Sequence, residues 1–282
     1  MNKYNIFCRH IYYIIKQFKE IVKTCGKIYR EIRKMKRNIC GIMIDDLDRR
    51  ALTAEISQRL REKRRTVIFT PNPIMVQNAK SDRDFFRILG SSDYNIPDGN
   101  GIILASRLLK TPIPERICGI ELAESMLEFA ARQGLGVFLY GGKQGVAELA
   151  GKRLTAKYRG LRICGVAHGY HTEEESRNII NRINTSGASL LYVCLGSPKQ
   201  EKWIDRNASK LPKVLLFMGL GGSLDVWSGN ITRAPRIMRD HGAEWAWRMA
   251  KSPKKLKDLP KLVSFGASAV AKRLFSVVIM HR

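Results

Sequence analysis

Short apolar runs, each followed by glycine and polar residues, recur through the middle of this chain and constrain its fold more than any other feature. The runs are unbroken rather than alternating, which is typical of strands buried on both faces of a parallel sheet. Amphipathic segments with helical spacing separate the runs, so strands and helices alternate along the chain. The sequence therefore predicts an α/β fold with a Rossmann-like, mostly parallel sheet flanked by helices.

The expected elements follow from the positions of these runs. We expect strands at residues 66–70, 94–97, 136–140, 161–166, 190–195 and 214–218. We expect helices at residues 119–133, 172–183 and 200–210, and a further helix that follows Gly141-Gly142 and runs through residue 157. Thr172 and Glu175 have the spacing of a capping box at the start of the helix at 172–183. Strand signals stop near residue 232, and the remainder is predicted to be helical.

Five of the predicted strand ends carry glycine and polar residues, and ligands of parallel α/β folds bind at that edge of the sheet. Glycine lets backbone amides approach an anion, and a following helix N-terminus favours negative charge. Together the segments indicate a site for a phosphate-bearing ligand, although purely structural turn glycines explain the 141–145 segment equally well. The segments are 70–73 (TPNP), 97–101 (PDGNG), 141–145 (GGKQG), 196–200 (GSPKQ) and 219–223 (GLGGS).

Asp98 is the acidic residue best placed for catalysis, because it stands between Pro97 and Gly99 at a predicted strand end. A tight turn there would aim the carboxylate into the cleft, where it could act as a general base. The alternative is a turn-forming aspartate that bonds only its own backbone, and spacing alone favours that alternative.

Positive charge is concentrated at the two ends of the chain, which has a net charge of +25. Residues 1–40 hold 11 Lys/Arg against 2 Glu, and residues 233–282 hold 12 against 3 acidic residues. We therefore divide the chain into a basic extension at 1–40, an α/β body at 41–232 and a basic helical appendage at 233–282. Residues 1–38 have the spacing of a basic amphipathic helix, which either binds a membrane or packs on the body. Such ends suit an anionic surface, either lipid or nucleic acid.

The sequence lacks the residues that several other classes of protein and of functional site require. We expect no secretory signal and no membrane-spanning helix, since no uncharged apolar stretch reaches about 18 residues. The six cysteines lack metal-ligand spacing and are interpreted as reduced thiols. Asp82-Arg83-Asp84 spells D-x-D but is interpreted as the first turn of a helix. The incomplete glycine pattern argues against a nicotinamide-dependent oxidoreductase, and no zinc-finger or RNP-type motif supports a nucleic-acid-binding protein, which is the main alternative.

Read together, the motifs resemble the WecG/TagA/CpsF family of bacterial glycosyltransferases over about residues 41–254. Their order and spacing carry the resemblance, since each motif is modest by itself. The motifs are TPNP at 70–73, IPDGNG at 96–101, PERICGIEL at 114–122, YGGKQGVAE at 140–148, HGY at 168–170, GSPKQEKW at 196–203, GGSLDVWSGNITRAPR at 222–236 and EWAWR at 244–248.

The resemblance implies an inverting enzyme that moves an N-acetylmannosamine-type sugar from a UDP donor to undecaprenyl-diphosphate-linked N-acetylglucosamine, for teichoic acid, capsule or exopolysaccharide synthesis. It implies that Asp98 is the general base that activates the acceptor hydroxyl. The other residues implied are Thr70 and Asn72 as pocket lining, Gln200 as a substrate contact, Tyr170 and Asp225 near the nucleotide, and Arg248 at the donor diphosphate. No metal or other cofactor is expected, because an arginine and helix N-termini can neutralise the diphosphate.

The resemblance further implies a peripheral enzyme on the cytoplasmic face of the bacterial plasma membrane, with an anionic lipid surface rather than nucleic acid as its partner. Two features depart from the family. Asn100 occupies a D-G-x-G position where the family is more often small or aliphatic, and the basic extension at 1–40 is longer than usual. The sequence leaves open the identity of the UDP-sugar, the pathway, and the oligomeric state, a homo-oligomer included.

Overall fold

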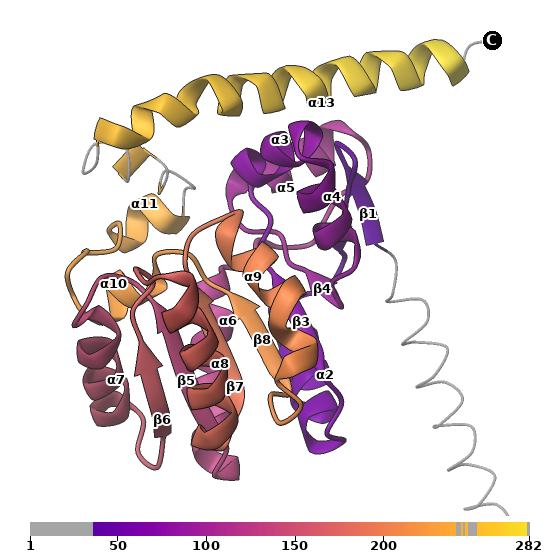
Figure 1. Cartoon of the computed structure of the whole chain (residues 1–282). Coiled ribbons are helices and arrows are strands. Elements are labelled where there is room, and N and C mark those ends of the chain that lie inside the picture. The colour runs from indigo at the N-terminus through magenta and orange to yellow at the C-terminus, as the bar shows by residue number, and fades with distance from the viewer. Residues whose placement is uncertain (1–35, 241–243, 245, 248–252, 281–282) are drawn as a thin grey trace, which may run out of the picture. The chain divides into compact units, whose positions relative to one another are not determined.

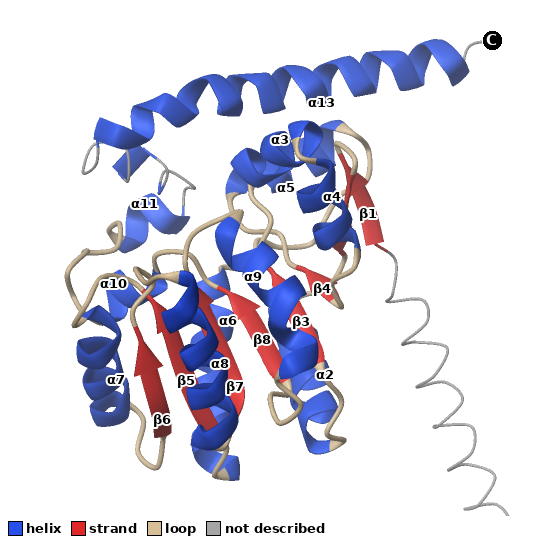
Figure 2. Ribbon diagram, viewed as in Figure 1, coloured by secondary structure: helices blue, strands red, loops and turns tan. Residues whose placement is uncertain are grey.

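The computed structural model describes residues 36–240, 244, 246, 247 and 253–280. The chain divides into two units, residues 1–36 and 37–282, and the second holds the sheet and its helices. In the described part, a six-stranded sheet in which every neighbouring pair of strands is parallel carries helices on both faces (Figures 1 and 2). The predicted α/β fold with a parallel sheet is confirmed.

The strands of this sheet have the spatial order β4-β3-β8-β7-β5-β6. All six predicted strands are present, and their ends differ from the prediction by at most two residues. Their bounds are β3 Thr66–Phe69, β4 Tyr94–Asn95, β5 Gly136–Gly141, β6 Arg162–Ala167, β7 Ala188–Cys194 and β8 Leu216–Gly219.

Alternate residues of each central strand enter two separate apolar cores. In β5, Val137 and Leu139 belong to one core, while Phe138 and Tyr140 belong to the other. This alternation follows from the two-residue repeat of a strand, and it buries the sheet on both faces. The first core is covered by α2 Arg49–Arg61, α6 Gly119–Gln133, α7 Val146–Lys157 and α10 Ser223–Trp227. The second is covered by α3 Pro73–Ser81, α4 Arg83–Gly90, α5 Asn100–Leu108, α8 Glu173–Ser186 and α9 Lys199–Asn207.

The N-terminal end of the described chain corrects the prediction. Helical spacing predicts a helix through residue 38, but β1 Lys36–Ile39 is a strand that pairs with β2 Ile42–Asp45. The turn between them has positive φ at Cys40 (51°) and Gly41 (105°), which folds the chain back on itself. Ile39, Ile42 and Ile44 thereby enter the second core, and this burial overrides the helical pattern. The rest of the predicted helix lies outside the described residues.

The described residues from 236 onward are helical, as predicted. They include α11 Arg236–Asp240, the short 3-10 helix η2 Pro253–Asp258 and the long α13 Leu259–Met280. Phe265 and Ala269 of α13 are buried in the second core, where α13 packs on α3 and α5 (Figure 1). No helix within the described ranges is long and apolar enough to cross a bilayer. The division of the chain at residues 232 and 233 stays a prediction.

Candidate active site

The turns that follow the parallel strands all lie at the edge of the sheet formed by the carboxyl ends of the strands. This edge is the candidate active site. After β5 the chain continues to β6, whereas after β7 it continues to β8 on the other side. The two turns therefore diverge between β5 and β7, which is where open α/β sheets bind ligands. They also pack closely, because a Cβ on Gly141 would lie 2.3 Å from the Cys194 carbonyl oxygen.

Asp98 lies beside the TPNP turn. Its backbone N–H donates to the Pro71 carbonyl oxygen at 3.1 Å, and the residue is half-buried. The Asp98 carboxylate lies close enough to Cys118 to affect the pKa of that thiol. Burial, and after it the negative charge of Asp98, raise the pKa of Cys118 to about 12. Asp98 therefore stands between the β3 turn and the start of α6.

Local sterics explain why glycine occupies the positions around Asp98. Gly99 has φ of +92°, a conformation that other residues rarely adopt. A Cβ on Gly101 would lie 2.5 Å from the Pro73 side chain, so α5 can approach the TPNP turn only with glycine there. Asn100, the residue that departs from the family, is the first residue of α5 and has no such restriction.

Thr70 and Asn72 hold the turn on the other side of Asp98. Thr70 is buried, and its hydroxyl donates to the Gly219 carbonyl oxygen at 3.5 Å. Asn72 is the N-cap of α3, and its side-chain oxygen accepts from the backbone N–H groups of Ile74 and Met75. Capping uses the oxygen of Asn72, which leaves its amide NH2 as the part of the side chain that a ligand can approach.

Gln200 is only 2% exposed and is held from two sides. Its side-chain oxygen accepts from the Gly221 backbone N–H at 2.8 Å, and its amide nitrogen donates to Glu201 at 2.7 Å. A Cβ on Gly219 would lie 2.9 Å from that amide nitrogen, so Gln200 packs directly on β8. Thr70 and Gln200 thus meet through Gly219. Substrate contact by Gln200 stays a prediction.

Tyr170 and Asp225 belong to a second group, built on the turn after β5. The Gly169 N–H donates to the Gly142 carbonyl oxygen at 2.8 Å, and a Cβ on Gly142 would lie 3.9 Å from Leu224. The loop of Tyr170 and the first turn of α10, where Asp225 stands, therefore both meet Gly142. The side chain of Tyr170 is 70% exposed. A cavity of about 310 Å³ lies here, lined by Lys143, Gln144, His168 and Tyr170.

An arginine cluster at the start of α6 was not singled out from the sequence. Glu121 pairs with Arg233 at 3.0 Å, with Arg49 at 3.4 Å and with Arg239 at 3.5 Å. Arg233 also donates to the thiol of Cys118, the residue close to Asp98. The pairings join Glu121 to residues at least 72 positions away, so no local pattern in the sequence indicates them. Arg248, predicted to act at the diphosphate, lies outside the described residues.

Comparison with known proteins decides the family. Residues 37–277 match the profile described as the Glycosyl transferase WecG/TagA/CpsF family. This chain belongs to that family. It is similar to two proteins named N-acetylglucosaminyldiphosphoundecaprenol N-acetyl-beta-D-mannosaminyltransferase. The protein from Bacillus subtilis is 34% identical over 69% of this chain and 76% of its own length. The protein from Bacillus spizizenii is 32% identical over 70% of this chain and 77% of its own length.

Family membership makes this protein a glycosyltransferase, and the site geometry accords with that chemistry. Asp98, Thr70, Asn72 and Gln200 gather around the turns after β4, β3 and β8. The second group, with Tyr170 and Asp225, lies around the turn after β5. Asp98 and Tyr170 follow the two outer strands of the sheet, β4 and β6.

Proposed function

We propose that this enzyme transfers an N-acetylmannosamine-type sugar from a UDP donor to N-acetylglucosamine on undecaprenyl diphosphate. The names of the two Bacillus relatives support this donor sugar and acceptor. The observation that carries the proposal is the position of Asp98, half-buried beside the Pro71 and Thr70 turn and on the same sheet edge as Gln200. Other UDP-hexose donors are the alternative within the family, and none of the site residues that the structure describes selects against them.

In the proposed reaction the acceptor hydroxyl attacks the anomeric carbon of the donor in a single displacement. The Asp98 carboxylate takes the hydroxyl proton, the new glycosidic bond forms, and the bond to the UDP oxygen breaks with its electron pair leaving on UDP. The anomeric configuration inverts. Thr70 and Asn72 bind the acceptor sugar at the same turn, and no covalent intermediate on the enzyme is needed.

The donor lies across the sheet edge towards the second group of residues. In this arrangement Tyr170 and Asp225 hold the nucleoside, and the turn after β5 together with the N-terminus of α7 receives the diphosphate. Lys143 in the adjoining cavity adds a cation there. Arg248 completes the charge balance at the leaving diphosphate, as the family resemblance implies.

Transfer is proposed to need no metal ion. The carboxylates of the D-x-D pattern already have structural roles: Asp82 caps α4 and pairs with Lys202 at 2.6 Å, while Asp84 pairs with Arg87 at 2.9 Å. The described residues contain no group of three or more potential metal ligands. Full turnover in EDTA, unchanged by added Mg²⁺ or Mn²⁺, is the expected result, and turnover that requires either metal contradicts the proposal.

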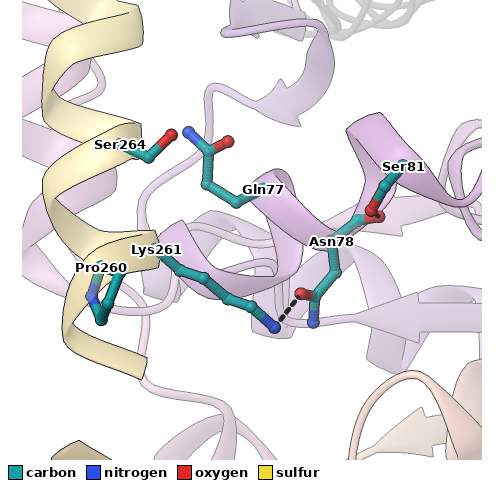
Figure 3. Close-up of a pocket in the computed structure, with 6 residues that line it drawn as sticks. All are labelled: Gln77, Asn78, Ser81, Pro260, Lys261 and Ser264. Atoms are coloured by element: carbon teal, nitrogen blue, oxygen red, sulfur yellow. Dashed lines mark hydrogen bonds between the residues drawn. The ribbon is translucent and has the colours of Figure 1, made fainter. Parts of the chain in front are cut away.

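The enzyme is proposed to bind an anionic membrane through α13. Its outward side chains Val263, Val270 and Leu274 are exposed and follow a helical spacing, so they form an apolar stripe. The inward face is tied to α3 by polar contacts, among them a bond from the Lys261 amine to the Asn78 side-chain oxygen at 2.7 Å (Figure 3). Residues 233–282 hold 12 Lys/Arg against 3 acidic residues, and an apolar stripe on such a basic segment suits a surface of anionic lipid.

The cytoplasmic face of the bacterial plasma membrane is the proposed location. The four cysteines of the described residues, Cys40, Cys118, Cys164 and Cys194, are free thiols, and free thiols accord with a reducing compartment. Self-association stays a prediction, which sedimentation of the full chain measures directly.

The test of the proposed function is a donor screen with full-length protein and N-acetylglucosamine on polyprenyl diphosphate, scored by the mass of the lipid product. We expect a product heavier by one N-acetylhexosamine with UDP-N-acetylmannosamine. In the same assay we expect Asp98→Asn to lower kcat by about 100-fold or more with little change in the KM for the donor. Asp84→Asn, which alters an exposed carboxylate away from the site, is the matched control. Near-normal turnover by the Asp98 variant contradicts the base assignment.

A further inference from the structure

Glu201 is a completely buried carboxyl group next to a predicted substrate-binding residue. It stands in the first turn of α9, directly after Gln200, and its exposed fraction is 0%. Its Oε1 accepts the hydrogen bond from the amide nitrogen of Gln200 at 2.7 Å. Its Oε2 is also buried, and the Ser197 side chain lies on the same carboxyl group. Burial raises the pKa of Glu201, and hydrogen bonds from the Gln200 side chain, from the backbone of Glu201 itself and from the Ser197 side chain oppose that rise.

A completely buried carboxyl group costs the fold stability, so its presence needs a reason other than stability. An apolar residue of similar volume at such a position is often neutral or better for stability. Residues that violate the rules of packing in this way gather at functional sites. Glu201 lies beside such a site, and its hydrogen bond with Gln200, at 2.7 Å, joins it directly to a predicted substrate-binding residue.

The geometry of Gln200 shows what that bond does. A backbone N–H can only donate, so the atom of Gln200 that faces Gly221 must be the amide oxygen. The amide nitrogen is thereby turned towards Glu201 and towards Gly219, whose missing Cβ makes room for it. Without an acceptor at Glu201 the amide would be held at one end only. Glu201 and Gly221 together therefore fix the rotation of the amide.

The same contacts connect Glu201 to the acceptor side of the site. Gln200 packs on Gly219, and the Gly219 carbonyl oxygen accepts the hydroxyl bond of Thr70. An amide nitrogen has two hydrogens, and the bond to Glu201 uses one of them. The second is the group with which Gln200 can bind a sugar hydroxyl next to Thr70.

We propose that Glu201 is a positioning residue, which orients the Gln200 amide so that its second N–H binds the acceptor sugar. This proposal rests on the proposed function for the identity of that sugar. It assigns to Glu201 no contact with either substrate. A misplacement of about 1 Å at a binding group lowers activity by up to about 100-fold, so loss of the orienting bond should be readily measured.

The test compares Glu201→Leu with Glu201→Gln in the full-length protein. Leu fills the space but accepts no hydrogen bond, whereas Gln keeps an acceptor oxygen for Gln200. We expect Glu201→Leu to raise the KM for the lipid-linked acceptor by about 10- to 100-fold, with the KM for the UDP-sugar unchanged. Glu201→Gln should stay within about threefold of wild type, because it restores the bond. Glu201→Met is the second apolar variant if the Leu variant does not fold.

A double-mutant cycle shows whether Glu201 acts through Gln200. The KM effects of Glu201→Leu and Gln200→Ala should be strongly non-additive, since both remove the same oriented amide. Asn207→Leu is the matched control: Asn207 is another buried polar residue of α9, and its amide bonds Trp203 at 2.9 Å, away from the site. This control should lower the melting temperature and leave both KM values unchanged.

Three results overturn the proposal: additive effects in the cycle, a fall in kcat alone with both KM values unchanged, and wild-type kinetics for Glu201→Leu. The same cycle measured by urea unfolding does not depend on the substrates. If wild-type protein transfers no sugar in the donor screen, the proposed function fails, while non-additive unfolding midpoints still test whether Glu201 holds Gln200. Additive midpoints remove that hydrogen bond from the proposal.

Discussion

The amine of Lys80 on α3 lies 2.6 Å from the hydroxyl oxygen of Ser268 on α13. Gln77 donates to the same hydroxyl at 3.3 Å. The helix with the exposed apolar stripe is therefore bonded to the helix that begins at Asn72, in the TPNP turn. α13 also packs on α5, which begins directly after Asp98 and Gly99. The proposed membrane contact thus rests on the two helices whose N-termini border the candidate base.

Weakening this contact should reduce transfer to a membrane-held acceptor more than it reduces membrane binding. We expect the double variant Lys80→Met, Ser268→Ala to retain vesicle binding but to lose about fivefold in turnover of lipid-linked acceptor, the size expected for about 1 kcal/mol of lost hydrogen bonding. Turnover of a short-chain, water-soluble acceptor should not change. Lys152→Met, at an exposed lysine of α7, is the control. Equal losses of turnover on both acceptors would show that the hydrogen bond between Lys80 and Ser268 contributes only to stability.

Gly101→Ala should damage the site through the TPNP turn. The added methyl group would lie 2.5 Å from the Pro73 side chain, so α5 must move and carry Asp98 with it. We expect kcat to fall by about 10- to 100-fold together with a lower melting temperature. Gly90→Ala is the control, because nothing lies within 4 Å of its added Cβ. Activity of Gly101→Ala equal to that of the control would mean that the turn and α5 adapt without moving Asp98.

Tyr170 should matter for nucleotide binding and not for stability. Its ring is largely exposed beside the cavity at Lys143 and His168, so its removal costs no core packing. If the uracil stacks on this ring, Tyr170→Ala should weaken UDP binding by about 5- to 100-fold, whereas Tyr170→Phe keeps the ring and should bind UDP as wild type does. Isothermal titration with UDP measures both. Unchanged UDP affinity of the alanine variant would mean that the uracil ring binds elsewhere on the sheet edge.

Low pH should destabilise the protein through Glu124. This carboxylate of α6 accepts from Lys157 of α7 at 2.8 Å and from the indole of Trp227 of α10 at 2.9 Å, so it joins three helices. Burial alone would raise its pKa, but the hydrogen bonds outweigh burial and the pKa of Glu124 is lowered. A carboxyl with a lowered folded pKa stabilises the fold above its unfolded value of about 4.3, and this contribution is lost as the pH falls through the folded pKa.

The Glu124→Gln variant tests that sign. We expect it to have a lower urea midpoint than wild type at pH 7 and a smaller further loss on acidification below about pH 4.3. Glu128→Gln, at an exposed residue of the same helix, should follow the wild-type pH dependence. A wild-type midpoint that rises on acidification in this window would contradict the assignment.

Features with a local cause were predictable from the sequence, and features made by distant residues were not. The sequence predicts α6 at Gly119–Gln133, the capping box of Thr172 with Glu175, and the start of a helix at Asp82, and each is confirmed. Periodicity, caps and turn residues act within a few positions, which is why they can be read from a sequence. The strand β1 was missed because its pairing and the burial of Ile39 decide its conformation.

The candidate site divides in the same way. The turns after the strands, and Asp98 among them, follow from the parallel sheet, because the carboxyl ends of parallel strands share one edge. The sequence could not predict that Gln200 is buried between Gly221 and Glu201, since the bond to Gly221 depends on how α9 packs on β8. The pairing of Glu121 with Arg233 joins α6 to a segment 112 positions later and left no local signal.

Glu121 should hold the segment after residue 232 on the body. It pairs with Arg233 and Arg239, and with Arg49 of α2, so removal of its charge leaves three arginines close together without their shared partner. We expect Glu121→Gln to speed cleavage by trypsin after residue 232 by about 3- to 10-fold, because a lost ion-pair network of about 1 kcal/mol raises the population of the opened segment by that factor. Urea unfolding of the sheet should change little. Glu148→Gln, in the first turn of α7, is the control. If trypsin cleaves Glu121→Gln and the control at the same rate, contacts other than this carboxylate hold the segment in place.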